Sequence, residues 1–407
     1  MRIALVSPYD WQTPGGVNNH VAQLRREFLE RGHETRILAP GTADPHEAGI
    51  TIVGRPRPIP ASGSTARISL NPRLGQKVRA LLAAGRYDVV HVHEPLMPVL
   101  PLQALRHARA ANPETITVGT FHATKDGGNR LYSYGRRLLK RWFREVDGKI
   151  AVSPPAANYV GRYFPGFYNI IPNGIDVGRF RDPSVARRPE LDDGMFNILY
   201  VGRAEKRKGL SYLIRAFGTV NARDPRTRLV VVGPNERALG RYRASVERMG
   251  RRGVHFVGRV PHEELASYYR SADIVCSPAV GHESQGYVLL EAMASGVPVV
   301  ASNIEGYASV VTHRRDGLLV RPKDPFALAD ALSALVSDPL QRRRLAAAGA
   351  HRVEEYSWPH VTERLLAYYE RLRDSRGIPA RRPADSMRAA PEDAGRTPPP
   401  RRAAAGR

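Results

Sequence analysis

The sequence predicts an α/β protein built from two doubly wound domains, and three observations support this prediction. Short apolar runs alternate with helical patterns from the first residue onward, which is typical of parallel strands covered by helices on both faces. The alternation stops at a Pro- and Gly-rich passage, 169–194, and then restarts. At 407 residues the chain is also too long for one ordinary core.

The first half contains apolar runs that we expect to be parallel strands. These runs are 2–7, 34–40, 87–93, 116–122 and 148–153. Between the first two, segment 17–31 repeats apolar residues at helical spacing, which predicts a helix packed on the sheet. We expect this half to form one domain, residues 1–178.

The second half repeats the same organisation and ends in a segment of different composition. Its expected strands are 196–202, 227–233, 253–258, 272–278, 297–302 and 317–320, in a domain spanning 179–358. An amphipathic helix is expected at 359–374, where Pro359 marks its start. Residues 375–407 are rich in Arg, Pro and Ala and poor in aliphatic residues, so we expect this tail to be disordered.

Composition limits the partners and the compartment. Lys and Arg number 62 against 39 Asp and Glu, a formal charge of +23, which points to phosphate-bearing partners such as nucleotides, nucleic acid or anionic lipid. A single cysteine, Cys276, permits no internal disulfide and fits a reducing cytoplasm. Pro8 and Asp10 interrupt the first apolar run, so it does not resemble a signal peptide. No run of about 18 apolar residues occurs, so we expect a soluble or peripheral protein.

A glycine pair, Gly15 and Gly16, stands between the first strand and its helix. Glycines at this position let a ligand approach the backbone and leave helix N-terminal N–H groups available to an anion. The pattern is not the dinucleotide fingerprint, and Pro40 and Gly41 stand where a ribose-binding acid would be expected, which disfavours an NAD enzyme. A tight turn and a phosphate contact explain the pair about equally well.

A cationic turn and two glutamates mark the second half. Arg203 and Lys208 flank a strand–helix turn and fit either a diphosphate site or a solvated loop. Glu283 lies just before a helix, and Glu291 follows inside an apolar run, where an unpaired carboxylate costs several kcal/mol, on the order of the ion desolvation penalty. Each glutamate alone fits a structural role. Together, beside the cationic turn, they favour a polyhydroxylated, phosphorylated ligand.

Several motifs make the chain similar to a known family. The segments "PGGVNNHV", "TFHAT", "IPNGID", "VGRAEKRKG", "GHESQGYVLLEAMASGVPVVAS" and "DGLLV" resemble those of the family 4 retaining glycosyltransferases. The similarity runs from residue 1 to about 372. Within that family, "SPYDWQTPGGV", "PIPASGSTARISLNP" and "VVHVHEPLMP" are most similar to actinobacterial phosphatidylinositol mannosyltransferases. The resemblance implies the GT-B fold: two Rossmann-like domains face each other across a cleft, and the C-terminal helix crosses back to the N-terminal domain.

The resemblance also implies roles for individual residues. The implied donor-binding residues are Gly15, Gly16, Arg203, Lys208, Glu283, Ser284, Gln285, Gly286, Tyr287 and Glu291. Arg203 and Lys208 would bind the donor diphosphate, joined by the N–H of Gly16. Glu291 would accept hydrogen bonds from the ribose, and Glu283 from the sugar hydroxyls, aided by the N–H groups of 284–287. The implied catalytic residues are His122, Glu283, Arg203 and Lys208, and the implied acceptor-side residues are Tyr9, Arg67 and His122.

The expected reaction needs no metal or other cofactor. The chain has no D-x-D motif, so Arg203, Lys208 and helix dipoles would stabilise the leaving diphosphate. Since Glu283 is assigned to sugar hydroxyls, we favour front-face substitution over a covalent intermediate. The expected function is transfer of mannose from GDP-mannose to a phospholipid such as phosphatidylinositol. One alternative is a UDP-sugar with another lipid or sugar acceptor. Another is a basic nucleic-acid-binding protein, although the basic residues are dispersed and no recognition motif occurs.

Two basic segments suggest contact with an anionic membrane. Segment 130–145 interleaves basic and aromatic residues and places Leu131, Tyr134, Leu138 and Trp142 on one helical face. Helix 72–84 adds further basic residues. A core helix with a solvated basic face is the alternative. We expect a monomer bound peripherally to the inner face of the plasma membrane.

Two histidines, His91 and His93, alternate along the third expected strand and therefore point to the same side of the sheet. Such a pair invites a metal site. Buried strand histidines are more often hydrogen-bonded core residues, and that is the role we expect here.

Overall fold

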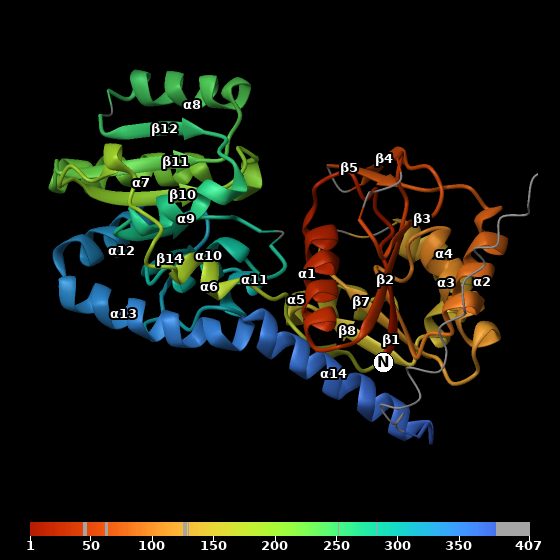
Figure 1. Cartoon of the computed structure of the whole chain (residues 1–407). Coiled ribbons are helices and arrows are strands. Elements are labelled where there is room, and N and C mark those ends of the chain that lie inside the picture. Colours follow the sequence, from red (N-terminus) through yellow and green to blue (C-terminus); the bar gives the residue numbers. More distant parts are fainter. Residues whose placement is uncertain are drawn as a thin grey trace, which may run out of the picture.

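The computed structural model describes residues 1–43, 47–61, 64–124, 128, 130–250, 252–281 and 283–379. The chain forms two α/β lobes, one built around each parallel sheet (Figure 1). The first sheet has the strand order β3-β2-β1-β6-β7-β8-β9. These strands are β1 (Arg2–Val6), β2 (Glu34–Ala39), β3 (Ile50–Ile52), β6 (Val89–His93), β7 (Ile116–Phe121), β8 (Gly148–Ala151) and β9 (Asn169–Ile170).

Helices cover both faces of this sheet. They are α1 (Gly16–Glu30), α2 (Leu74–Gly85), α3 (Leu100–Ala111), α4 (Arg130–Arg144) and α5 (Pro154–Gly161). On α1, Val21, Leu24 and Phe28 recur at helical spacing and are fully buried against one face, as the sequence pattern predicts. Helices α2 and α3 bury their apolar residues on the other face.

A two-stranded hairpin, β4 (Arg57–Ala61) and β5 (Ser64–Ile68), stands apart from the sheet and was not expected from the sequence. Prolines at positions 58 and 60 disfavour a central strand, because proline lacks the N–H that such a strand needs. A two-stranded hairpin tolerates them. An isolated bridge joins Ile68 to Tyr9, just after β1, so the hairpin lies beside the carboxyl end of the first strand.

The second sheet has the order β12-β11-β10-β13-β14-β15. Its strands are β10 (Phe196–Val201), β11 (Thr227–Val232), β12 (Val254–Gly258), β13 (Ile274–Ser277), β14 (Val299–Ser302) and β15 (Leu318–Val320). The helices are α6 (Val177–Arg181), α7 (Leu210–Arg223), α8 (Glu236–Arg248), α9 (Leu265–Arg270), α10 (Tyr287–Ala294), α11 (Glu305–Ala308), α12 (Pro325–Ser337) and α13 (Pro339–Arg352). The topological switch points, where ligands bind in such folds, lie between β1 and β6 and between β10 and β13.

The C-terminal helix α14 (Trp358–Ser375) leaves the second lobe and runs beneath the first, beside α1 (Figure 1). Trp358, Val361, Leu365 and Tyr369 are buried in the core that α1 and the first sheet share. This helix therefore packs on the lobe opposite to the one that precedes it in the chain.

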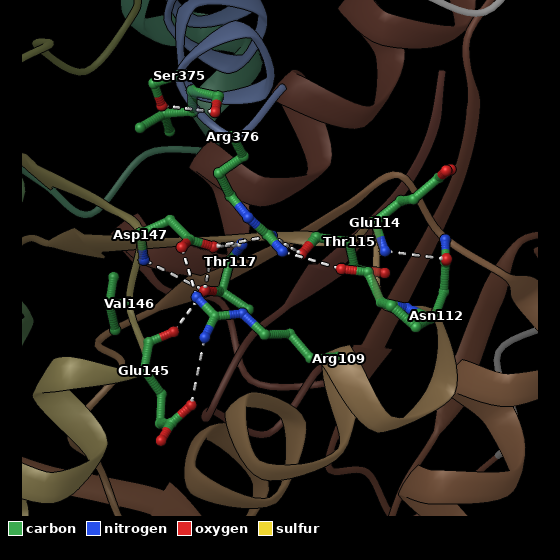
Figure 2. Close-up of polar contacts among 12 residues, drawn as sticks. Arg109, Asn112, Glu114, Thr115, Thr117, Glu145, Val146, Asp147, Ser375 and Arg376 are labelled. Atoms are coloured by element: carbon green, nitrogen blue, oxygen red, sulfur yellow. Dashed lines mark hydrogen bonds and ion pairs between the residues drawn. The ribbon is translucent and has the colours of Figure 1, made fainter. Parts of the chain in front are cut away.

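The end of α14 is fastened to the first lobe by polar contacts (Figure 2). Arg376 donates to the carbonyls of Thr115 and Pro113 at 2.6 and 2.9 Å and lies 3.7 Å from Asp147, which also pairs with Arg109. Ile378 is buried in the same core as α14. Residues 375–379, expected to begin the disordered tail, therefore pack on the first lobe, because the apolar Ile378 and the guanidinium of Arg376 find partners there. The rest of the expected tail, 380–407, lies outside the described residues.

The predicted fold class is confirmed: the chain is α/β with two parallel sheets, and each predicted strand corresponds to an observed one. Among the described residues, no helix has both the length and the apolar character needed to cross a bilayer.

Candidate functional site between the two sheets

A cavity of about 320 Å³ lies between the two lobes. The first lobe contributes residues that follow β1 and β7, and the second contributes the turn after β10 and the loop after β13. The lining residues are Gly16, Val17, His122, Asn173, Lys208, Glu283, Ser284, Gln285, Gly286, Tyr287, Val288 and Tyr307. The structure thus brings together many of the residues implied for the donor, and it does so at the carboxyl ends of the strands.

Lys208 and Glu283 form the charged centre of this cavity. The Lys208 Nζ lies 2.8 Å from Glu283 Oε1, and the Arg207 guanidinium approaches the same oxygen at 2.5 Å. The side chains of Lys208 and Glu283 are only 17% and 12% exposed. No group among the described residues bonds to the second oxygen, Oε2. Glu283 is therefore held by two cations through one oxygen, and its other oxygen has no partner among the described residues.

Arg203, the other half of the expected cationic pair, is not part of this centre. Its guanidinium pairs with Glu205 at 2.9 Å, its side chain is 65% exposed, and it does not line the cavity. Arg207, which the sequence did not single out, takes the position beside Glu283 and also pairs with Glu205. Arg207 lies in the middle of the 3-10 turn η2 (Lys206–Lys208), and Arg203 precedes that turn, so the path of the chain between β10 and α7 decides which arginine reaches Glu283.

The glycine pair opens α1 with free space around it. Gly15 is the N-cap of α1 with extended backbone, and neither glycine has a positive φ. A Cβ added at Gly15 or Gly16 would meet no atom within 4 Å. The fold itself therefore does not require glycine at these positions, and Gly16 borders the cavity. Close approach of a ligand to the backbone is the remaining physical reason for glycine here.

The loop before α10 is held tightly and presents backbone donors to the cavity. A Cβ on Gly306 would lie 1.9 Å from the Glu283 carbonyl oxygen, so glycine at 306 lets α11 pack against this loop. Gly286 caps α10 with φ 87°, a conformation that glycine adopts without strain. No acceptor among the described residues takes the N–H groups of Ser284, Gln285, Gly286 or Tyr287. These N–H groups and the helix dipole form a site suited to an anion.

Two residues of this loop connect the lobes through their side chains. The Gln285 Oε1 accepts from the backbone N–H and the side-chain amide of Asn173 at 2.8 and 2.9 Å, and its amide donates to the Asn173 carbonyl at 3.1 Å. The hydroxyl oxygens of Ser284 and Ser153 lie 3.2 Å apart. The family resemblance implied only a backbone role for Gln285. In the structure its buried side chain hydrogen-bonds the loop to the segment that connects the lobes.

Glu291, like Glu283, is bonded through only one of its carboxylate oxygens among the described residues. The Tyr269 hydroxyl donates to Glu291 Oε2 at 2.6 Å, and no group among the described residues bonds to Oε1. Burial raises the pKa of this carboxyl, and the Tyr269 hydrogen bond and the charges of Arg179 and Lys208 oppose that shift. The half-buried carboxylate does not line the cavity itself but lies about one turn along α10 from Tyr287, which does.

His122, just after β7, lines the cavity from the first lobe. Its backbone N–H and that of Ala123 donate to Glu94 Oε1 at 2.7 and 2.8 Å. Glu94 is buried with a positive φ of 49°, and burial raises its pKa despite those two bonds. Burial lowers the pKa of His122 to about 4, with Asn173 opposing the shift, so the imidazole is neutral near pH 7. Glu94 thus positions His122. In the sequence, the only sign of this role is that Glu94 directly follows an expected strand.

The strand histidines differ in their surroundings. His91 is a hydrogen-bonded core residue, as expected, because its two ring nitrogens lie 2.6 Å from the Tyr369 hydroxyl and the Thr120 hydroxyl. His93 stacks on His91 and its Nδ1 lies 3.0 Å from His122 Nε2. His93 is therefore connected to the site, which the sequence did not indicate.

Of the three acceptor-side residues, His122 lines the cavity, while Tyr9 and Arg67 lie next to each other outside it. Tyr9 is half-buried, and burial and the charge of Glu94 raise its pKa. Arg67 is exposed on β5, and its carbonyl accepts from the N–H of Asp10 at 2.8 Å. The β4–β5 hairpin therefore places Arg67 beside the turn that holds Tyr9. Neither residue lines the donor-side cavity.

Helix α4 exposes an apolar row on a basic helix. Tyr134 and Leu138 are 87% and 70% exposed, and Leu131 is also exposed, while Tyr132, Leu139 and Phe143 point into the core. Of the four residues expected on one face, only Trp142 is half-buried and packs against the core clusters. The helix thus has a separate core face, and its exposed row remains available for another contact.

Comparisons with known proteins agree with this architecture. The family described as "Glycosyltransferase Family 4" matches residues 14–179, and "Glycosyl transferases group 1" matches residues 184–352. A phosphatidyl-myo-inositol mannosyltransferase of Mycobacterium leprae is 37% identical over 380 residues, which cover 92% of this chain and 98% of the relative. One from Propionibacterium freudenreichii is 34% identical over 398 residues, covering 93% and 98%. The crystal structure of HepE of Anabaena in complex with UDP superposes with a TM-score of 0.73 at 17% identity, covering 91% and 100%. The chain therefore belongs to the family 4 glycosyltransferases of GT-B fold, as its motifs indicated.

Proposed function

We propose that the protein transfers mannose from GDP-mannose to a phosphatidylinositol-type phospholipid with retention of configuration. The observation that carries the proposal is the cavity in which Gly16, His122, Lys208 and Glu283 converge from two lobes. The mycobacterial and propionibacterial relatives, which are named phosphatidyl-myo-inositol mannosyltransferases and match nearly the whole chain, support mannose as the transferred sugar and phosphatidylinositol as the acceptor.

The free oxygens of the two glutamates support a nucleotide-sugar donor. Glu283 and Glu291 each use one oxygen for protein contacts and keep the other unengaged among the described residues. Glu283 lines the cavity, where sugar hydroxyls would lie, and Glu291 lies further along α10, where the ribose would lie. The diphosphate between them would be bound by Lys208, the N–H of Gly16 and the start of α10, with Arg203 swinging in from its exposed position.

The same contacts favour front-face substitution without a metal. Glu283 is paired with Lys208 and Arg207, which lowers its nucleophilicity and fixes it as a hydrogen-bond acceptor. The departing diphosphate would be stabilised by Lys208 and the α10 dipole while its oxygen takes the acceptor proton. Turnover that survives EDTA would support this proposal, and a glycosyl group trapped covalently on Glu283 would contradict it.

We further propose that α4 places the enzyme on the inner face of the plasma membrane. An exposed row of Leu131, Tyr134 and Leu138 on a strongly basic helix suits insertion among anionic headgroups. The wild-type protein is expected to co-sediment with vesicles of phosphatidylinositol and phosphatidylcholine. The double variant Tyr134→Ser, Leu138→Ser is expected not to co-sediment. Phe326→Ser, at a similarly exposed site on α12 of the second lobe, is the matched control. Equal loss with the control would contradict the role of α4.

The donor and acceptor are tested directly. GDP, UDP and ADP are compared by thermal shift and calorimetry, and radiolabelled mannose is then followed from GDP-mannose into phosphatidylinositol. GDP is expected to give the largest stabilisation. Stabilisation by UDP alone would favour the alternative of a UDP-sugar with another acceptor. Lys208→Ala is expected to lower kcat/KM by about a hundredfold or more, as loss of one preorganised charge contact does.

A further inference from the structure

We propose that His20, His93 and His122 form a binding site for a borderline divalent cation such as Zn²⁺, whose occupancy inhibits the enzyme. These three histidines come from α1, the end of β6 and the residue after β7. Because α1 follows β1 and the strands β1, β6 and β7 are adjacent, all three side chains meet at the carboxyl edge of one sheet. Each offers one ligand nitrogen, and these nitrogens lie within 4.8 Å of one another.

The ring arrangement is compatible with one ion. The ring centroid of His20 lies 5.3 Å from that of His93 and 5.0 Å from that of His122. The centroids of His93 and His122 lie 5.3 Å apart. The His93 Nδ1 and His122 Nε2 are 3.0 Å apart. Two nitrogens bound to tetrahedral Zn²⁺ at about 2.0 Å lie about 3.3 Å apart, so these rings need to move little. The ion would replace the proton that they now share, and that proton would move to solvent or to a ring's other nitrogen.

Two buried ring nitrogens in the cluster have no partner in the described part of the chain: His20 Nδ1 and His93 Nε2. Both residues are buried, with exposed fractions of 5% and 0%. By contrast, the neighbouring His91 has both of its nitrogens bonded. A buried polar atom without a partner is costly, at about 1–3 kcal/mol, and an ion bound by His20 Nδ1 would remove that cost at His20. His93 faces His122 through Nδ1, so it would bind the ion through Nδ1 and its Nε2 would be unaffected.

The imidazoles are in the form that binds metals. Burial lowers the pKa of His20 and His93 well below the usual value and that of His122 to about 4, so all three are neutral near pH 7. Neutral imidazole nitrogen is a preferred ligand of Zn²⁺, Cu²⁺ and Ni²⁺, while Mg²⁺ and Ca²⁺ prefer oxygen. Three protein ligands leave a fourth position for water. His122 borders the cavity, which provides the entry path.

Metal binding is measured first, on untagged full-length protein without substrates, with Co²⁺ as the probe and Zn²⁺ as the competitor. We expect one ion per chain, with visible ligand-field bands of nitrogen ligation. His20→Gln and His93→Gln should each raise the Co²⁺ Kd by at least about tenfold, since even loss of an outer-shell partner has that effect. His351→Gln, at an exposed histidine of α13, is the control and should bind as the wild type does. Absence of saturable 1:1 binding, or unchanged affinity in both folded cluster variants, would overturn the site.

A measurement on the wild type covers the case in which the buried variants fail to fold. Pulsed electron paramagnetic resonance of the Cu²⁺-loaded protein counts the coordinated imidazoles. Three are expected, and one or none would refute the assignment.

Inhibition rests on the proposed function, because the ion would hold His122 away from the donor sugar. Stoichiometric Zn²⁺ should suppress mannose transfer, and EDTA should restore it. Restoration by the chelator alone identifies the metal as the cause. If Zn²⁺ binds and transfer is unaffected, the regulatory role is refuted while the site stands. If GDP does not bind at all, the proposed donor fails independently of the metal titration.

Discussion

Replacing Glu291 with leucine tests whether its carboxylate binds the ribose. The free Oε1 is expected to accept a charge-assisted hydrogen bond, worth about 1.5–3 kcal/mol, which corresponds to a rise in the GDP Kd of about tenfold to 150-fold. The same change removes the acceptor of the Tyr269 hydroxyl, which is buried and bonded at 2.6 Å. An unsatisfied buried hydroxyl lowers the free energy of unfolding by about 1–3 kcal/mol. Affinity and stability are therefore both expected to fall.

Two companion variants separate the two effects. Tyr269→Phe keeps the carboxylate and loses only the internal bond, so the Kd should change by no more than a few-fold. The double variant Tyr269→Phe, Glu291→Leu leaves no orphaned hydroxyl and should regain most of the lost stability, because removing both partners is far less costly than removing one. Its affinity for GDP should stay as low as that of the single Glu291 variant. Calorimetry gives the Kd, and thermal unfolding gives the stability.

The result that would refute the reasoning is specific. If the double variant folds with nearly wild-type stability and binds GDP with the wild-type Kd, Glu291 has no contact with the nucleotide. Its role would then be to satisfy Tyr269 alone. If Tyr269→Phe weakens GDP binding as strongly as Glu291→Leu, the tyrosine positions the carboxylate, and the free oxygen is not the whole explanation.

Three further predictions concern the glycine turn, the histidines and the C-terminal segment. Gly16→Ala should leave the melting temperature unchanged, because its Cβ meets no atom within 4 Å, yet weaken GDP binding; Gly240→Ala, equally open but on α8, is the control and should leave binding unchanged. The folded pKa values of His91, about 3, and His122, about 4, lie below the unfolded value of about 6.5, so the unfolded chain binds more protons as the pH falls. Denaturant titrations should show that the free energy of unfolding falls between pH 7.5 and pH 5, by at most about 2 kcal/mol for each of the two histidines. Equal free energies of unfolding at the two pH values would contradict the burial of these histidines as neutral rings. Arg376→Ala should lower stability by about 1–3 kcal/mol and speed hydrogen exchange at the end of α14; unchanged exchange there would mean that its contacts in Figure 2 do not anchor the helix.

Much of the architecture is readable from local pattern. Unbroken apolar runs such as 229–232 are buried on both sides only between two covering layers, so the parallel strands and their alternation with helices follow from burial. The short strands β3 and β9 were missed because three or two residues carry no periodicity. The β4–β5 hairpin was missed because its prolines fit an isolated pair but not a central strand.

Some residues of the site could likewise be predicted from the sequence, and others could not. The sequence singled out Gly16, Lys208 and Glu283 because they stand at strand–helix turns, and Glu291 because it is a charge inside an apolar run. Arg207 could not be distinguished from Arg203, because both lie in the basic segment between β10 and α7 and only the path of that segment decides which one contacts Glu283.

The sequence by itself determined the two-sheet class, the switch-point loops and the chemical character of the ligand, because these depend on residue types over short stretches. Only the tertiary structure decided which cation pairs with Glu283, that Gln285 clasps Asn173 across the lobes, and that His20, His93 and His122 meet. Those contacts join residues from different elements. Their distances are set by how strands order within a sheet and how two lobes pack, and no local pattern encodes them.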